Sequence, residues 1–179
     1  MLGDKTTWHH GERWTVMPSP KGWRLTENSS GATWMDLSKF EIDTQARHKA
    51  AAYGRVSNAG LGLGWSALEL ASNPNVSEVH TYERSSELID AITSRLEIPV
   101  DVAHKLHWHH VDCLSGPLPD IGPVDHLYMD IWLPAGDPNI LADARRMISL
   151  MPRKPTVASM WSAEFQTPNP ETIIAAELR

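Results

Sequence analysis

A loop that holds three glycines, where an expected strand leads into an expected helix, constrains this fold more than any other feature. The glycines are Gly60, Gly62 and Gly64, with the strand expected at 55–59 and the helix at 65–72. Glycine lets the backbone bend sharply and approach a ligand closely. The spacing Gly-x-Gly-x-Gly differs from the Gly-x-Gly-x-x-Gly of dinucleotide enzymes, and a tight turn without a ligand would also use it.

An acidic residue closes the next expected strand, at 79–83. Glu83 lies 23 residues after Gly60, a spacing at which a carboxylate can accept hydrogen bonds from two ribose hydroxyls. The two strands, the loop and the helix form a βαβ unit. Together they favour a site for a nucleoside-containing cofactor.

Further strands and helices continue this alternation along the chain. The strands are expected at 105–111, 125–131 and 156–161, and the helices are expected to begin at Ser85 or Ser86 and at Asp137-Pro138. Strands that alternate with helices predict an α/β fold with a parallel sheet and right-handed crossovers. Ligands of such sheets bind beyond the carboxyl ends of the strands. Asp112 and Asp130, like Glu83, close strands and are therefore candidate site residues.

The first 43 residues have a different pattern from the rest, and we predict two units, 1–43 and 44–179. Short strands are expected at 13–17, 22–27 and 32–37, separated by proline-, serine- and glycine-rich turns. They predict a small antiparallel β meander. An alanine-rich helix is expected to follow at 44–53, with Thr44 as its N-cap.

The end of the chain leads to an expectation about assembly. A last short helix is expected from Asn169-Pro170, which leaves too few residues for a final antiparallel strand pair. The strand at 156–161 would then be an apolar edge of the sheet. Such edges pair with another chain or must be covered, so we predict a homodimer.

Composition narrows the partners and the compartment. The 179 residues fit one domain with a small appendage, and the net charge of −6 makes general affinity for nucleic acid unexpected. The single cysteine, Cys113, cannot form an internal disulfide. There is no apolar run near 18 residues and no signal-peptide core at the N-terminus. We therefore expect a cytoplasmic protein without a membrane span.

Four markers in order give the chain a resemblance to class I S-adenosylmethionine-dependent methyltransferases. They are the loop from Asn58 to Gly64, the strand ends Tyr82-Glu83 and Val111-Asp112-Cys113, and the sequence Tyr128-Met-Asp130-Ile-Trp132. The resemblance covers about residues 44–165 and implies a Rossmann-like methyltransferase fold. The chain also resembles small methyltransferase-like proteins of phages and bacteria.

The resemblance implies a role for each matching residue. Gly60, Gly62 and Gly64, with Asn58 before them, would hold the methionine end of S-adenosylmethionine. Glu83 would bind the ribose, and Asp112 and Cys113 would lie at the adenine edge. Asp130 would face the methionine amino group or the substrate, where it is our candidate base, and Trp132 either stacks on a substrate ring or packs beneath the following helix.

Three departures from the family pattern matter for the reaction. Asn58 stands where the family has an acidic residue that contacts the cofactor's ammonium group. No Asp/Asn-Pro-Pro-aromatic motif follows the fourth strand, which argues against DNA adenine methylation. The third departure is the shortened end of the fold.

The N-terminal meander is similar to that of polyamine aminopropyltransferases, but Leu133 stands where their second carboxylate would follow Asp130.

Several other side chains have both a functional and a structural interpretation. On a strand, His107 and His109 would share one face while His110 points the other way. No cysteine or nearby carboxylate pair completes a tetrahedral set with them, so we predict no metal site. Cys113 is interpreted as a buried apolar group and Trp65 as core. The pair His9-His10 is interpreted as part of a disordered tail.

The sequence therefore predicts an S-adenosylmethionine-binding methyltransferase that acts on a small-molecule or protein acceptor. One alternative is an aminopropyltransferase that uses decarboxylated S-adenosylmethionine. The other is a non-catalytic binding module that keeps the fold. Calorimetry with the cofactor would separate the two enzymes from the module.

Overall fold

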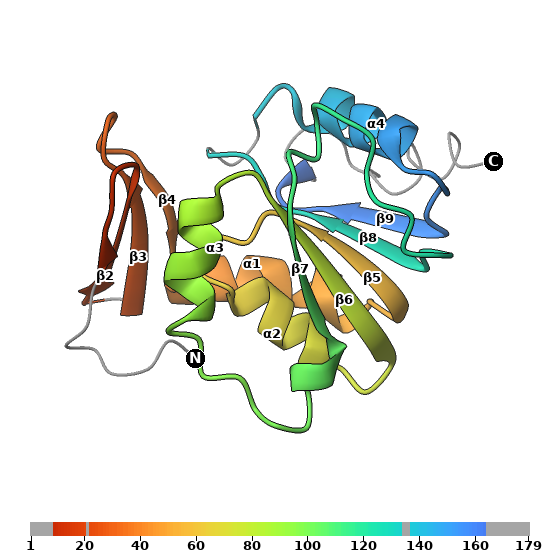
Figure 1. Ribbon diagram of the computed structural model, residues 1–179, viewed down its shortest axis with the longest axis horizontal. Helices are drawn as coiled ribbons and strands as arrows, with labels where there is room; N and C mark the ends of the chain where they lie inside the picture. The colour runs from red at the N-terminus through yellow and green to blue at the C-terminus, as the bar shows by residue number, and fades with distance from the viewer. Residues whose placement is uncertain (1–8, 21, 134–136, 164–179) are drawn as a thin grey trace.

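The computed structural model describes residues 9–20, 22–133 and 137–163, which form two sheets and four α-helices (Figure 1). The first sheet contains β1 (His9–His10), β2 (Trp14–Ser19), β3 (Gly22–Glu27) and β4 (Thr33–Asp36). The second contains β5 (Gly54–Ala59), β6 (Val76–Glu83), β7 (Leu106–His110), β8 (His126–Met129) and β9 (Val157–Met160). The helices are α1 (Lys39–Ala50), α2 (Trp65–Ser72), α3 (Ser86–Thr93) and α4 (Ile140–Leu150), with a 3₁₀ turn at Ala103–Lys105.

The larger sheet has the strand order β7-β6-β5-β8-β9, and every described pairing in it is parallel. The order reverses between β5 and β8, so this is the switch point where ligands of such sheets bind. The predicted α/β fold with a mostly parallel sheet is confirmed. Among the described residues no antiparallel strand joins this sheet, and β9 lies at its edge.

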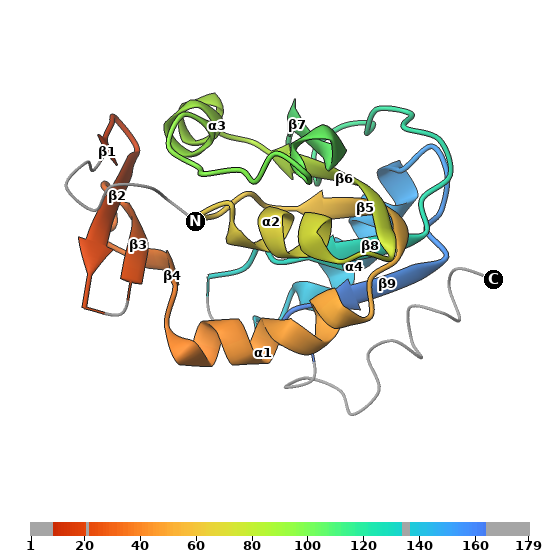
Figure 2. The same cartoon turned by 90° about the horizontal axis from the view of Figure 1, so that it is seen from below.

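Helices cover the two faces of this sheet unequally. α1, α2 and α3 lie side by side over one face, while α4 lies on the other (Figure 2). Apolar side chains of α4 pack against those of β8 and β9, including Met147 against the layer of Met129 and Met160. The connection from β7 to β8, residues 111–125, contains no helix. The face of β6 and β7 on the α4 side therefore has no helix above it.

The antiparallel sheet at the N-terminus confirms the predicted meander and packs against the glycine loop. Met35 of β4 lies against the loop, and its sulfur accepts a hydrogen bond from the Leu63 amide at 3.3 Å. Glu87 at the start of α3 also holds the small sheet in place, because its carboxylate accepts hydrogen bonds from the backbone amides of Arg13 and Trp14 at 3.0 and 3.1 Å. The small sheet thus forms a wall beside the carboxyl ends of the parallel strands.

Some local predictions were wrong. His9-His10 is not part of a disordered tail but forms β1, which pairs with β2. The first helix begins at Lys39 rather than at Thr44, because the Ser38 hydroxyl caps it by accepting from the Glu41 amide. The Thr44 hydroxyl donates to the Phe40 carbonyl inside the helix. Position 43/44 lies within α1, and the division into two units stays a prediction.

In the C-terminal half of the chain, the N-cap of one helix differs from the sequence prediction. α4 has Asn139 as its N-cap, and the Asp137 carboxylate instead accepts from the Asn139 amide in the preceding turn. The expected helix from Asn169 lies outside the described residues. The homodimer stays a prediction. No helix in the described part of the chain is long and apolar enough to cross a membrane.

Candidate active site

A pocket opens at the carboxyl ends of β5, β6 and β8, where the small sheet meets the large one. It has a volume of about 870 Å³, part of which is open to solvent. Six of the predicted site residues line it together with Trp132; the six are Gly60, Gly62, Glu83, Asp112, Cys113 and Asp130. Trp14, Leu25, Trp34 and Met35 of the small sheet line the opposite wall. Asn58 and Gly64 do not line it.

The three glycines of the loop have left-handed backbone conformations, with φ of 90° at Gly60, 52° at Gly62 and 76° at Gly64. Residues other than glycine rarely adopt these φ values. At Gly60 a Cβ atom would also lie 2.5 Å from the Asp130 carbonyl oxygen. The loop therefore runs directly against the end of β8, and this close approach shapes the floor of the pocket.

The Glu83 carboxylate is fixed beside the loop. It is only 9% exposed, and it accepts hydrogen bonds from the amide of Leu61 at 3.3 Å and from the amide of Ser85 at 2.8 Å. A carboxylate has about four lone-pair sites, so acceptor capacity remains for ligand hydroxyls. The position and orientation of Glu83 fit the predicted contact with a ribose.

Asn58 is fully buried behind the loop. Its side-chain amide donates to the Gly60 carbonyl at 3.3 Å and to the Thr81 hydroxyl at 3.1 Å, while its Oδ1 has no partner. A buried acceptor without a donor costs about 1–3 kcal/mol. Asn58 does not line the pocket, so it supports the loop from behind through the Gly60 carbonyl.

Asp112 and Cys113, which the resemblance assigns to the adenine edge, line the pocket just after the end of β7. The Asp112 carboxylate accepts from the Leu114 amide at 2.9 Å and from the Ser115 hydroxyl at 2.7 Å. Although burial acts to raise the pKa of Asp112, these hydrogen bonds hold it below its ordinary value. Burial raises the pKa of the Cys113 thiol to about 12, so the thiol stays neutral and is no nucleophile.

A chain of hydrogen bonds joins Asp130 to helix α1. The Gln45 side-chain amide donates to the Asp130 carboxylate at 2.8 Å and to the Glu41 carboxylate at 3.0 Å. The Gln45 carbonyl oxygen accepts from the Ser66 hydroxyl at 3.2 Å. Gln45 thus holds two acidic side chains at the same side of the pocket, and both Glu41 and Asp130 line it.

Burial governs the charge of this group. It raises the pKa of Asp130 to about 7 and, with the nearby charge of Asp130, raises the pKa of Glu41 to about 7. Burial also lowers the pKa of Lys49, one turn beyond Gln45, to about 7. The Lys49 ammonium lies 2.8 Å from the centroid of the Trp65 ring. Near neutral pH each of the two carboxyls is therefore partly protonated.

Sequence reasoning missed Glu41, Gln45 and Lys49. They are spaced four residues apart, so they share one face of α1, and the buried residues of this helix are all polar: Gln45, His48 and Lys49. In the sequence these polar residues look like solvent-exposed ones, so the sequence carried no signal of their burial. Trp132 is 6% exposed and donates to the Asp143 carboxylate of α4 at 2.8 Å, so it packs under the following helix with one side at the pocket.

The raised pKa of Glu41 predicts a cost in stability. Below about pH 4.5 Glu41 is protonated in both the folded and the unfolded chain. As the pH rises towards 7, Glu41 ionises in the unfolded chain while it keeps its proton in the folded chain. The free energy of unfolding therefore falls over this range. Glu41→Gln should therefore raise the free energy of unfolding by about 1–2 kcal/mol at about pH 8. Urea titrations check this, and the difference should shrink towards pH 4. An unchanged or lower midpoint at pH 8 would contradict it.

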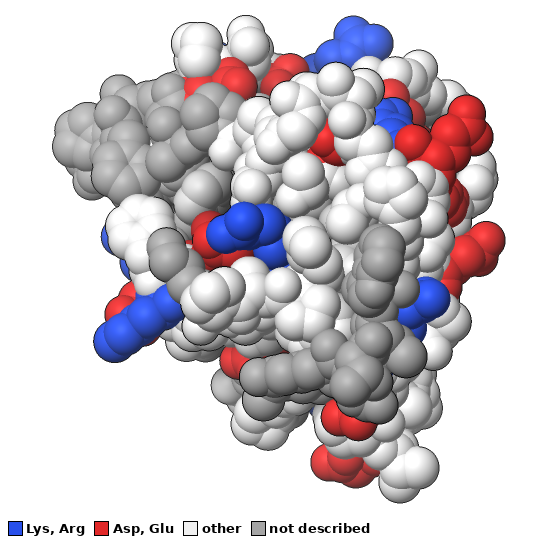
Figure 3. Space-filling view, turned by 90° about the vertical axis from the view of Figure 1, so that its left-hand side faces the viewer, with Lys and Arg blue, Asp and Glu red and all other residues white. Residues whose placement is uncertain are grey.

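The surface around the small sheet carries both signs of charge. On the face in Figure 3, basic and acidic side chains of the described residues stand singly or in small mixed groups among uncharged ones. Arg84 lines the pocket, and its guanidinium carbon lies 5.7 Å from the centroid of the Trp34 ring. Arg84 therefore places a cation at the rim of the pocket, beside the acidic side chains of Glu83, Asp112 and Asp130.

Comparison with solved structures shows which known proteins share this fold. A spermidine synthase from Thermotoga maritima superposes with a TM-score of 0.56 at 12% identity, over 86% of this chain and 55% of its own. A spermidine synthase in complex with the transition-state analogue AdoDATO gives 0.57 at 10% identity, over 86% and 56%. The chain has the Rossmann-like methyltransferase fold. The resemblance predicted from the glycine loop is confirmed at this level.

Other comparisons show how far the similarity to known proteins extends. A dimethyladenosine transferase from Plasmodium falciparum gives a TM-score of 0.50 at 18% identity, over 69% of this chain and 41% of its own. The chain thus spans about half the length of these structures. No protein-family model and no curated protein sequence matches it. Identities this low support the fold, and function must be argued from the pocket.

Proposed function

We propose that this protein is a transferase that binds S-adenosylmethionine in the pocket at the switch point and alkylates an amine. The observation that supports it best is the convergence of Glu83, the glycine loop and the Glu41–Asp130 pair on one pocket. Glu83 and the loop suit the nucleoside and methionine ends of the cofactor. When bound, such a cofactor supplies an electrophilic carbon on a sulfonium leaving group.

The acidic pair supports an amine as the acceptor. Glu41 and Asp130 lie on the same side of the pocket, and a protonated amine placed between them would favour their ionised forms. Trp14, Trp34 and Trp132 add aromatic side chains to the pocket wall, which suit an ammonium group. Asp130 would then take a proton from the ammonium, so that the free amine attacks the transferred carbon.

The geometry also supports the aminopropyltransferase alternative more than the sequence did. The sequence lacks a second carboxylate after Asp130, but Glu41 supplies one from α1 through Gln45. The two spermidine synthases superpose over 86% of this chain. Calorimetry with decarboxylated and intact S-adenosylmethionine separates the two reactions, since the enzyme should bind its own cofactor more tightly.

Binding of the product S-adenosylhomocysteine tests the proposed cofactor. A ligand that binds only the folded chain at a hundredfold excess over its dissociation constant stabilises it by about 2.7 kcal/mol. For a chain of this size, that should raise the melting temperature by roughly 5–10 °C. Differential scanning fluorimetry measures the shift, with adenosine and methionine as separate controls.

A stabilised protein is then incubated with S-adenosylmethionine and a panel of small amines, and the formation of S-adenosylhomocysteine is followed. Turnover with an amine but not with the matching alcohol supports the proposed acceptor class. Binding without turnover on any acceptor favours the non-catalytic module. No thermal shift at millimolar ligand would rule out the proposed cofactor.

A further inference from the structure

A cluster of histidines lies on the sheet face that has no helix above it. Glu78 and His80 extend from β6 on the α4 side, and His107 and His109 extend from β7 on the same side. The register places His80 directly opposite His107. Parallel sheets normally bury apolar side chains under helices on both faces. Here the helix-free connection from β7 to β8 leaves imidazoles and a carboxylate in that position.

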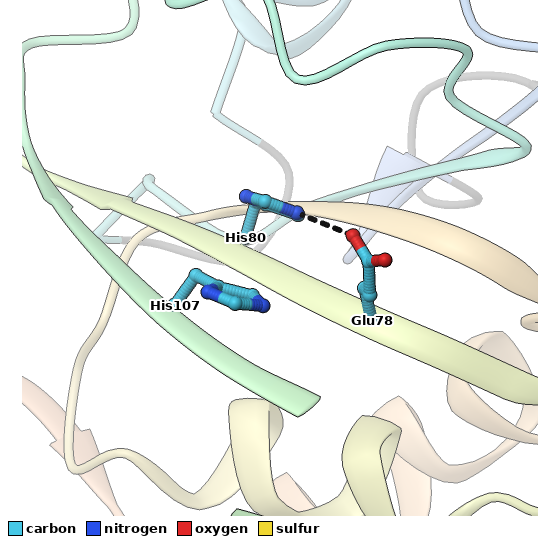
Figure 4. Close-up of side chains that lie close together, drawn as sticks. All are labelled: Glu78, His80 and His107. Carbon is cyan, nitrogen blue, oxygen red and sulfur yellow. Dashed lines mark hydrogen bonds and ion pairs between the residues drawn. The ribbon is translucent and has the colours of Figure 1, made fainter. Parts of the chain in front are cut away.

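The ligand atoms of three of these residues are close together. Glu78 Oε2 lies 3.1 Å from His80 Nε2, and the carboxylate, the His80 ring and the His107 ring each place one such atom within 4.8 Å of the others. Figure 4 shows Glu78 and His80 side by side on β6, with His107 reaching towards them from β7. The rings of His80 and His107 are stacked, with centroids 4.5 Å apart and an interplanar angle of 16°.

Neighbouring groups orient two of these side chains. The Arg55 guanidinium donates to both oxygens of Glu78, at 2.8 and 3.2 Å. On the other side of the His80 ring, Nδ1 lies 3.0 Å from His109 Nε2. A histidine that binds a metal through one nitrogen commonly donates its other ring N–H to an acceptor, and His109 Nε2 is placed to accept it from His80.

The types of donor also suit a metal ion. Glu78, which is paired with Arg55, offers a carboxylate oxygen, and His80 and His107 each offer an imidazole nitrogen. Metal ions bind deprotonated carboxylates and neutral imidazoles.

We propose that Glu78, His80 and His107 form a binding site for a divalent transition metal, with Zn²⁺ as the ion that fits best. Two imidazoles and one carboxylate are a donor set that Zn²⁺ uses, with a water molecule as the fourth ligand. Bonds of this kind place neighbouring ligand atoms about 3.4 Å apart. The Glu78–His80 pair is already near this separation.

Binding requires one local change. Because the stacked rings are nearly parallel, their nitrogen lone pairs do not meet at one point, so the His107 ring must rotate towards Glu78. A metal ion on His80 Nε2 requires the ring proton to lie on Nδ1, so the proton between Glu78 and His80 moves to Nδ1, which then donates to His109 Nε2, and no net proton is released. His109 is a positioning residue that holds His80 through Nδ1.

The location of the site indicates what the ion would do. None of the three ligands lines the pocket at the carboxyl ends of the strands. β7 is an edge strand, and a shared metal would join its side chains to those of β6 where no helix packs over them. The ion is therefore expected to strengthen the β6–β7 edge rather than to take part in group transfer, and the inference does not depend on the proposed function.

Calorimetry with ZnCl₂ on the full chain, produced without a histidine tag and stripped of metal with EDTA, tests this site. One Zn²⁺ per chain should bind and raise the melting temperature. His107→Ala should weaken binding at least about tenfold, and His109→Ala should weaken it about tenfold or more. His110→Ala is the matched control, since His110 lies on the same strand with its Nε2 near the Arg84 carbonyl, and binding should be unchanged.

His107 lies on the edge strand, so its alanine variant should keep the circular dichroism spectrum of the parent. Co²⁺ titration gives a second readout, because a tetrahedral site with nitrogen ligands produces visible absorption bands that His107→Ala should remove. Absence of Zn²⁺ binding at submillimolar concentration overturns the proposal. Equal loss in His110→Ala and His107→Ala, or full binding in His107→Ala, overturns it as well.

Discussion

Replacing Glu83 by glutamine should weaken the binding of S-adenosylhomocysteine about tenfold or more while the chain stays folded. Charge-assisted hydrogen bonds contribute about 1.5–3 kcal/mol, and the two ribose hydroxyls would each donate one to this carboxylate. Glutamine keeps the length of the side chain but has one acceptor oxygen and no charge. That oxygen must also serve the amides of Leu61 and Ser85, which now bond to separate oxygens of Glu83.

Calorimetry with the parent and Glu83→Gln measures this loss directly. Glu12→Gln is the control, since Glu12 is exposed and lies outside the pocket wall. Melting curves without ligand show whether the loop has been disturbed, because loss of an amide partner would lower the melting temperature by itself. If Glu83→Gln folds as the parent does and binds equally well, Glu83 does not hold the ribose.

The parallel sheet could be predicted because its signals are local. Each strand is followed by a helix or a turn with recognisable residues, and the glycine loop marks the first crossover. The left-handed φ values at Gly60, Gly62 and Gly64 are conformations that favour glycine. The expected carboxyl ends of the strands predicted the position of the pocket from the sequence alone.

The acidic pair could not be predicted in this way. Pattern analysis searches helices for an apolar face, and α1 has a buried face made of Gln45, His48 and Lys49. Its polar residues look like solvent-exposed ones in the sequence. Only the packing of α1 against the end of β8 shows that Gln45 reaches Asp130. The N-cap error at Thr44 added to this, since it left Glu41 outside the predicted helix.

The histidine cluster shows a second limit of sequence reasoning. His107 and His109 were correctly expected on one face of their strand, as their common stacking with His80 confirms. The prediction of no metal site rested on the lack of a cysteine or a nearby carboxylate pair that would complete a tetrahedral set. Glu78 and His80 come from the neighbouring strand, and the register that places His80 opposite His107 depends on tertiary packing.

Replacing Asp130 by asparagine should lower the transfer rate at least 100-fold without loss of cofactor binding. A positioned general base typically contributes 10²–10⁴-fold, and asparagine cannot accept the proton of an ammonium. The parent rate should rise with pH up to about 7, as the buried carboxyl ionises. Because Glu41 and Asp130 influence each other, the profile reports the pair rather than one residue.

Two further measurements separate catalysis from folding. Asp130→Asn removes a carboxyl that is costly to ionise in this environment, so the variant should unfold at a higher urea concentration than the parent at neutral pH. Its pocket should still raise the melting temperature with S-adenosylhomocysteine. Glu41→Gln, which keeps the hydrogen bond from Gln45, should reduce the rate less than Asp130→Asn. A stable, cofactor-binding Asp130→Asn variant with the parent rate would show that Asp130 is not the base.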